Sequence, residues 1–259
     1  MDDSLQVTMH SPNSQPPAAD NLLINGKMNF PCESTAEQCV PNAGISKYFF
    51  TPGKKYRLRL INTGAAVNAK FSIDGHKMTV IAQDFTSVTP YETDLVSLAN
   101  GQRIDVVVEA TGEAGSSFWM RFDIGSATPA DTCIGALAST TRLAFAAIYY
   151  DGADENSIPT TETQIDPARL IPCSGDPLEQ LVPTEVIPAN PQGELMTIEM
   201  NINFTQSRDG SGNINNAWTI NDMPYRADTS RALLSKAQQD SLNTTSDLMS
   251  VSRTFHKIS

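Results

Sequence analysis

Residues 54–62 read KKYRLRLIN, and this stretch decides the class of fold. Tyr56, Leu58 and Leu60 alternate with two arginines, which is the two-residue period of a strand with one buried face. Gly, Pro, Asn and Asp form turn signals between this stretch and others of the same period. The others are RIDVVVEA (103–110), SFWMRFDI (117–124) and RLAFAAIYY (142–150). We therefore predict an all-β protein built as a Greek-key β-sandwich.

The sequence argues against two classes of partner, nucleic acids and membranes. The 259 residues carry a net charge of −11 and no run rich in lysine and arginine, so we do not expect a nucleic-acid partner. No apolar stretch reaches the roughly 20 residues that cross a bilayer, so we expect no membrane contact. Residues 1–20 lack the basic start and apolar run of a signal peptide. We expect that the chain as written does not direct its own secretion.

The cysteines indicate an oxidising compartment instead. Four cysteines allow three connectivities, and we predict Cys32–Cys39 and Cys133–Cys173, with four free thiols as the alternative. Two glycosylation sequons, at Asn203 and Asn243, fit the same compartment. Because this composition comes without a signal peptide, we expect that the natural start of the protein is missing.

Proline density divides the chain. Seven prolines between residues 159 and 191 argue for an extended connector, and a new alternating stretch, ELMTIEMNINF, begins at residue 194. The stretches LLINGKMNF (22–30) and AWTINDMPY (217–225) echo each other, by shared architecture or by chance. We predict a helix at 229–239 after this echo. The predicted parts are a flexible segment 1–20, a domain 21–155, a connector 156–193 and the truncated start of a second β domain, 194–259.

Few residues offer catalytic or metal-binding chemistry. The histidines His10, His76 and His256 are scattered, and no zinc, nucleophile-elbow or phosphate-loop motif occurs. The dipeptide Asp74-Gly75 predicts a two-residue hairpin turn, with His76 at the start of the returning strand. We favour a structural role for His76 over a role as metal ligand, and we predict neither catalytic nor metal-binding residues in this chain.

Five stretches carry a family resemblance. They are LLINGK (22–27), PGKKYRLRLINTG (52–64), FSIDGHKMTVIAQD (71–84), DLVSLANGQRIDVVVEA (94–110) and WMRFD (119–123). In order and spacing they resemble the second cupredoxin (plastocyanin-like) domain of laccase-like multicopper oxidases, especially those of filamentous fungi. The resemblance covers residues 20–155 and returns at WTINDMPY (218–225), which is similar to the opening of the third domain.

The resemblance implies a cupredoxin-like sandwich and a secreted three-domain enzyme, extracellular or associated with the cell wall. Such an enzyme oxidises phenols or related reductants at a type 1 copper and reduces dioxygen to water. Its copper ligands lie in His-x-His motifs of the first and third domains, and this chain has no such motif. The chain would then be an inactive fragment that binds no copper, whose partners are the missing first and third domains.

The resemblance also concerns the substrate. In many laccases an acidic residue five positions before the Phe of the FSIDGH motif holds the phenol or amine near the type 1 copper. The corresponding position is Ala66, and the loop Gly64, Ala65, Ala66 contains no acid. We expect weakened diphenol binding unless Asp84 or Glu92 reaches the pocket, which makes a pigment or secondary-metabolite substrate equally compatible.

Two other functions remain open. The first is a non-enzymatic cupredoxin-like interaction module, which would be a well-behaved soluble species rather than an aggregating fragment. The second is a small electron-transfer copper protein, which would turn blue with added copper.

Overall fold

The computed structural model describes most of the chain. The described residues are 21–30, 32–34, 39–40, 43–64, 68–124, 142–170, 175–188, 197, 199–208, 210, 212, 214–224 and 235. Contacts divide the chain into two units, of which the larger comprises residues 18–188. We describe each unit by itself.

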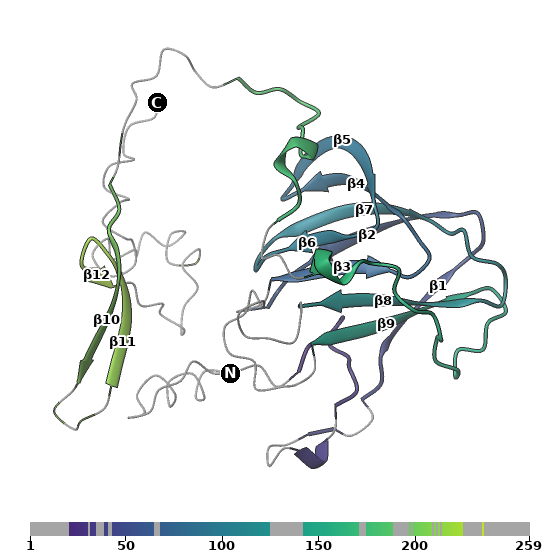
Figure 1. Cartoon of the computed structure of the whole chain (residues 1–259), viewed down its shortest axis with the longest axis horizontal. Helices are drawn as coiled ribbons and strands as arrows, with labels where there is room; N and C mark the ends of the chain where they lie inside the picture. The colour runs from purple at the N-terminus through teal and green to yellow at the C-terminus, as the bar shows by residue number, and fades with distance from the viewer. Residues whose placement is uncertain are drawn as a thin grey trace. The chain divides into compact units, whose positions relative to one another are not determined.

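The larger unit is a sandwich of two sheets (Figure 1). One sheet has the order β1 (Ser46–Phe50), β9 (Leu143–Tyr150), β8 (Ser117–Asp123), β3 (Ala69–Ile73), β6 (Val96–Leu98). The other has the order β2 (Lys55–Ile61), β7 (Arg103–Glu109), β4 (Met78–Gln83), β5 (Thr86–Thr93). Only the β1–β9 pairing is parallel among the described strand pairs. The predicted all-β sandwich is confirmed.

Alternation along the strands builds the core between the sheets. Tyr56, Leu58 and Leu60 of β2 pack against the core, as the two-residue period predicts. The core itself consists of side chains from both sheets, including Val106 of β7 and Ile148 of β9, each with no exposed surface. Burial of each such side chain contributes about 1.5–3 kcal/mol. The four strands predicted between residues 54 and 150 all form.

The dipeptide Asp74-Gly75 does not form the predicted hairpin. Strand β3 ends at Ile73 and pairs with β6 and β8, whereas β4 starts at Met78 and pairs with β5 and β7. The His76 N–H donates to the Ile73 carbonyl at 3.1 Å, so the chain does turn here, and Gly75 has a φ of +68°. The turn is a corner between the two sheets, because the hydrogen-bonding edges of β3 are already occupied.

The described residues of the connector, 156–170 and 175–188, lie along the larger unit with little regular structure. They contain the single-turn helix α2 (Pro167–Leu170) and the 3₁₀ turn η2 (Leu178–Gln180); a further 3₁₀ turn, η1 (Cys32–Ser34), precedes the sandwich. Proline is tolerated at the first position of a helix, which explains α2 within a proline-rich segment. The Thr89 N–H donates to the Val182 carbonyl at 2.7 Å, and the connector thereby covers the outer edge of β5. No helix in the described part of the chain is long and apolar enough to cross a membrane.

The smaller unit contains the antiparallel strands β10 (Ile202–Arg208), β11 (Ile214–Ile220) and β12 (Met223–Pro224). The strand predicted to start at residue 194 was placed too early, because residues 199–201 are not in a strand. The predicted helix at 229–239 lies outside the described residues except for residue 235. The sequence echo has a structural counterpart: both copies turn through two residues with positive φ, at 25–26 and at 221–222.

Candidate functional site

The loop predicted to meet substrate begins at one end of the sandwich. Asn62, which is 4% exposed, follows β2 and donates from Nδ2 to the Leu98 carbonyl at 3.0 Å. Its Oδ1 accepts from the Gly64 N–H at 2.9 Å. Because this amide binds both the end of β6 and the loop, it fixes the direction in which the loop leaves the sheet. Ala65 and Ala66 lie outside the described residues.

The turn between β6 and β7 supports the same loop. The Asn100 side chain donates to the Gly64 carbonyl at 2.8 Å, and the Gly101 N–H donates to the Asn62 carbonyl at 2.9 Å. Gly101 has a φ of +78°, a conformation that costs glycine little and other residues more. The loop at 62–64 and the turn at 99–102 therefore form one hydrogen-bonded end of the sandwich.

The tip of the β4–β5 hairpin reaches this end as well. Asp84 Oδ1 accepts from the Arg103 backbone N–H at 3.0 Å and pairs with Arg103 Nη1 at 3.1 Å. Arg103 Nη1 also donates to the Gly101 carbonyl at 2.8 Å. Of the two acids proposed to replace the missing one, Asp84 thus lies at this end but is paired. Glu92 lies towards the other end of β5, where it pairs with Lys77 at 2.8 Å.

An exposed phenyl ring lies at the tip of the β4–β5 hairpin. Phe85 is 90% exposed, and the Arg103 guanidinium lies 4.1 Å from the centroid of its ring. Neither Phe85 nor Arg103 was predicted from the sequence as a site residue, because no motif of the sequence indicates that the two side chains meet.

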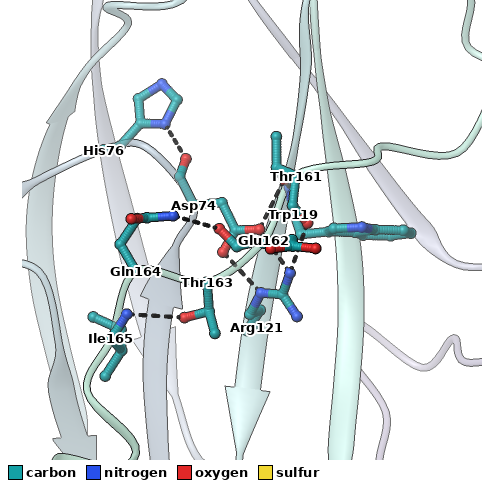
Figure 2. A network of polar contacts seen from close by, with 9 residues as sticks. All are labelled: Asp74, His76, Trp119, Arg121, Thr161, Glu162, Thr163, Gln164 and Ile165. Atoms are coloured by element: carbon teal, nitrogen blue, oxygen red, sulfur yellow. Dashed lines mark hydrogen bonds and ion pairs between the residues drawn. The ribbon is translucent and has the colours of Figure 1, made fainter.

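A second polar cluster occupies the opposite end of β3. The carboxylate of Asp74 lies between Arg121 of β8 and Thr161 of the connector (Figure 2). Arg121 donates from Nε to Oδ1 and from Nη2 to Oδ2, each at 2.7 Å, and the Thr161 hydroxyl donates to Oδ2 at 2.7 Å. The Asp74 side chain is 2% exposed. This two-point ion pair ties β8 to the corner between the sheets, and the Thr161 hydroxyl ties the connector to the same carboxylate.

His76 belongs to this second cluster and serves the fold. Its Nδ1 lies 2.8 Å from the Asp74 carbonyl and its Nε2 lies 2.6 Å from the Tyr150 hydroxyl. Since a carbonyl only accepts, Nδ1 carries the proton and Nε2 accepts from the hydroxyl. Burial lowers the pKa of His76 below its ordinary value of 6.5. The Tyr150 hydroxyl could also accept from a protonated Nε2, so it is burial of the ring that favours its neutral form.

The described residues do not fit a copper centre. No group of three or more His, Cys, Asp or Glu side chains that could hold a metal ion occurs among them. His76 has both ring nitrogens engaged by protein atoms, which leaves no lone pair for a metal. His10 and His256 lie outside the described residues.

The predicted covalent features are partly visible. Cys32 and Cys39 form a disulfide, as predicted, whereas Cys133 and Cys173 lie outside the described residues. Asn203 lies on β10 and is exposed, a position that permits glycosylation. Asn243 lies outside the described residues.

Sequence comparison identifies proteins that are similar to this chain. The family model described as "Multicopper oxidase" matches residues 2–143. Oxidoreductase OpS5 of Beauveria bassiana is 38% identical over 181 residues, which are 69% of this chain and 29% of that protein. Laccase-2 of Botryotinia fuckeliana is 36% identical over 169 residues, which are 65% of this chain and 27% of that protein. The chain thus spans less than a third of the length of these two relatives.

Structure comparison agrees with the sequence matches. The crystal structure of a laccase from Botrytis aclada matches with a TM-score of 0.62 and 27% identity. The match covers 88% of this chain and 39% of that chain. The multicopper oxidase Fet3p, at 18% identity and a TM-score of 0.56, shares the fold.

Proposed function

Because the chain belongs to the multicopper oxidase family, we propose that it forms the middle of a laccase-like enzyme. In this proposal residues 21–155 are the second cupredoxin domain, residues 156–193 are the connector, and residues 194–259 open the third domain. The single observation that carries the proposal is the match of the family model to residues 2–143, which includes all strands of the sandwich up to the start of β9.

The role of the chain within such an enzyme would be to shape the substrate pocket rather than to hold copper. The loop at Gly64 is held by hydrogen bonds to Asn62 and Asn100, so it would present a fixed wall to a reductant. In this proposal the neighbouring domains supply the copper ligands. When bound by those neighbours, copper would accept electrons from the reductant and deliver them to dioxygen. We propose an extracellular or cell-wall location for the whole enzyme.

The apolar face of the smaller unit supports an incomplete third domain. Phe204 and Trp218 are opposite each other on β10 and β11, with ring centroids 5.1 Å apart, and are 53% and 66% exposed. Ile202, in the same row, is 63% exposed. A strand face of this composition normally packs against a second sheet, which further strands of the domain would provide.

Expression of the complete reading frame around this chain tests the proposal. The full product should bind copper, show the blue absorption of a type 1 site and consume dioxygen with ferrocyanide as reductant. The 259-residue chain, as the matched control, should bind no copper by metal analysis and consume no dioxygen. A full product without copper or oxygen consumption would refute the enzyme. A control that turns blue with copper would instead support an electron-transfer protein.

A second candidate function rests on the same exposed face. If Ile202, Phe204 and Trp218 served association with another protein, the chain would be a non-enzymatic cupredoxin-like interaction module. Size-exclusion chromatography separates the two functions, because an evolved module should elute as a defined species, whereas a domain fragment should aggregate through this face.

A further inference from the structure

We propose that Phe85 and Arg103 form the contact surface for the reducing substrate, and that this surface selects neutral or anionic aromatic rings over protonated arylamines. This inference rests on the proposed function, since it concerns the substrate of that enzyme. The inference goes beyond the proposed function because it names two residues outside the Gly64 loop and the charge class of the substrate.

The first observation is the place of Phe85. The hairpin tip, the loop at 62–64 and the turn at 99–102 are joined through Asp84, Arg103 and Gly101, with hydrogen bonds of 2.8–3.0 Å. Phe85 therefore stands at the same end of the sandwich as the loop that would line the pocket. Its ring contributes little to the core, because 90% of its surface is exposed.

The second observation is the backbone of Phe85. Gln83 pairs with Thr86, so Asp84 and Phe85 form a two-residue turn with φ angles of 46° and 71°. Such a turn favours Asn-Gly or Asp-Gly, because a side chain at positive φ is strained. A bulky ring that is both strained and exposed is not explained by folding, and strain of this kind is concentrated at binding sites.

The third observation is the charge around the ring. Asp84 is the only carboxylate in the described segments 62–64, 83–86 and 99–103, and Arg103 neutralises it. Residues 65–67 read Ala-Ala-Val and add no acid. Within these described segments a protonated amine therefore finds no unpaired carboxylate. A neutral ring can stack on Phe85, and an anionic substituent can accept from guanidinium N–H groups of Arg103 other than those of Nη1, which pairs with Asp84.

Two substitutions at one position separate binding from folding. Phe85→Asn removes the ring and suits the turn, because asparagine adopts positive φ more easily than phenylalanine. Phe85→Tyr retains the ring and is the matched control. Both are made in the product of the complete reading frame, whose folding is checked by circular dichroism. Phe85→Gly, which also suits the turn, replaces Phe85→Asn should the latter fail to fold.

The measurement is the KM and kcat for four reductants: a neutral phenol, an aryl sulfonate, an arylamine that is protonated at the assay pH, and ferrocyanide. Phe85→Asn should raise the KM for the phenol and the sulfonate about two- to tenfold, the range expected for one lost ring contact. The kcat and the ferrocyanide KM should not change, and Phe85→Tyr should behave as the wild type. The wild type should have a higher kcat/KM for the phenol than for the protonated arylamine.

Three results overturn the inference. The first is an unchanged KM for the aromatic reductants in Phe85→Asn. The second is a parallel rise of the ferrocyanide KM, which would reveal a structural role. The third is a wild-type preference for the protonated arylamine. Oxidation of ferrocyanide together with any of these results leaves the proposed enzyme intact and removes only the inference. No oxygen consumption with any reductant removes both.

Discussion

The buried ion pair at the corner between the sheets gives the sharpest prediction for stability. In Asp74→Ala, Arg121 keeps its charge but loses both bonds to the carboxylate, and its side chain is only 14% exposed. Removing one partner of a buried pair costs about 3–5 kcal/mol, because the other charge stays buried and unpaired. Thr161→Val is the matched control: it removes the hydroxyl that donates to the same carboxylate and accepts from the Trp119 N–H at 3.2 Å, and it should cost about 1–2 kcal/mol.

Urea unfolding followed by tryptophan fluorescence measures this loss. The chain has two tryptophans, Trp119 in the larger unit and Trp218 in the smaller, so a Trp218→Phe background leaves only Trp119 as reporter. With a slope of about 2 kcal/mol per molar urea, Asp74→Ala should lower the midpoint by about 2 M, and Thr161→Val by about 0.5–1 M. Equal shifts in the two variants would refute the reasoning. Adding Arg121→Met to Asp74→Ala removes the unpaired charge. The free energy of unfolding should then rise again by more than 1 kcal/mol, and we expect about 2 kcal/mol.

Three further predictions concern other parts of the chain. Burial lowers the pKa of His76, so unfolding takes up a proton and the free energy of unfolding should fall as the pH drops below 6.5; His76→Gln should flatten this dependence in urea titrations. Reduction of Cys32–Cys39, whose positions are separated by 7 residues, should lower the stability in thermal unfolding by about 2–3 kcal/mol. Peptide mapping of the oxidised chain should also recover Cys133–Cys173. Free thiols at Cys133 and Cys173 would contradict this pairing. Phe204→Ser should reduce binding of a hydrophobic dye and self-association in light scattering.

The sequence predicted the sandwich well because the strands that decide it have one buried face. The alternation in 54–62 places Tyr56, Leu58 and Leu60 towards the core, and their partial burial favours the observed register of β2 against β7. The same reasoning misplaced the start of the strand predicted from residue 194. Met200 and Ile202 of this stretch alternate with polar residues, as they would in a strand with one buried face. Both are more than half exposed, and without a covering layer the alternation does not determine where a strand begins.

The Asp74-Gly75 turn shows a limit of local signals. The dipeptide predicted a turn, and a turn is present, with Gly75 at positive φ. The choice between a hairpin and a corner depends on which strands pair with β3, and these are β6 and β8, at least 23 residues further along the chain. Loss of the hairpin also changes the interpretation of His76, which is a buried acceptor for Tyr150 rather than the first residue of a strand.

The position of Phe85 could not be predicted from the sequence for a related reason. Its importance depends on three segments that meet at one end of the sandwich, and their meeting follows from sheet order rather than from any motif. Position 66 holds an alanine instead of the acid that the family resemblance implies. The pairing of Asp84 with Arg103 next to the exposed Phe85 ring depends on the β4–β5 tip and the β6–β7 turn lying next to each other.

Strand β3 separates the two polar ends of the sandwich and makes them independent. The loop with Gly64 precedes β3 and Asp74 follows it, so the five residues Ala69–Ile73 hold the ends roughly 17 Å apart, at about 3.3 Å per residue. Substitutions this far apart with no shared partner are expected to add in their effects on free energy. Asp74→Ala should therefore destabilise the enzyme without changing the KM for an aromatic reductant, and Phe85→Asn should change that KM without loss of stability. Coupling between the two substitutions would mean that the rigid wall assumed for the Gly64 loop moves with the corner at Asp74.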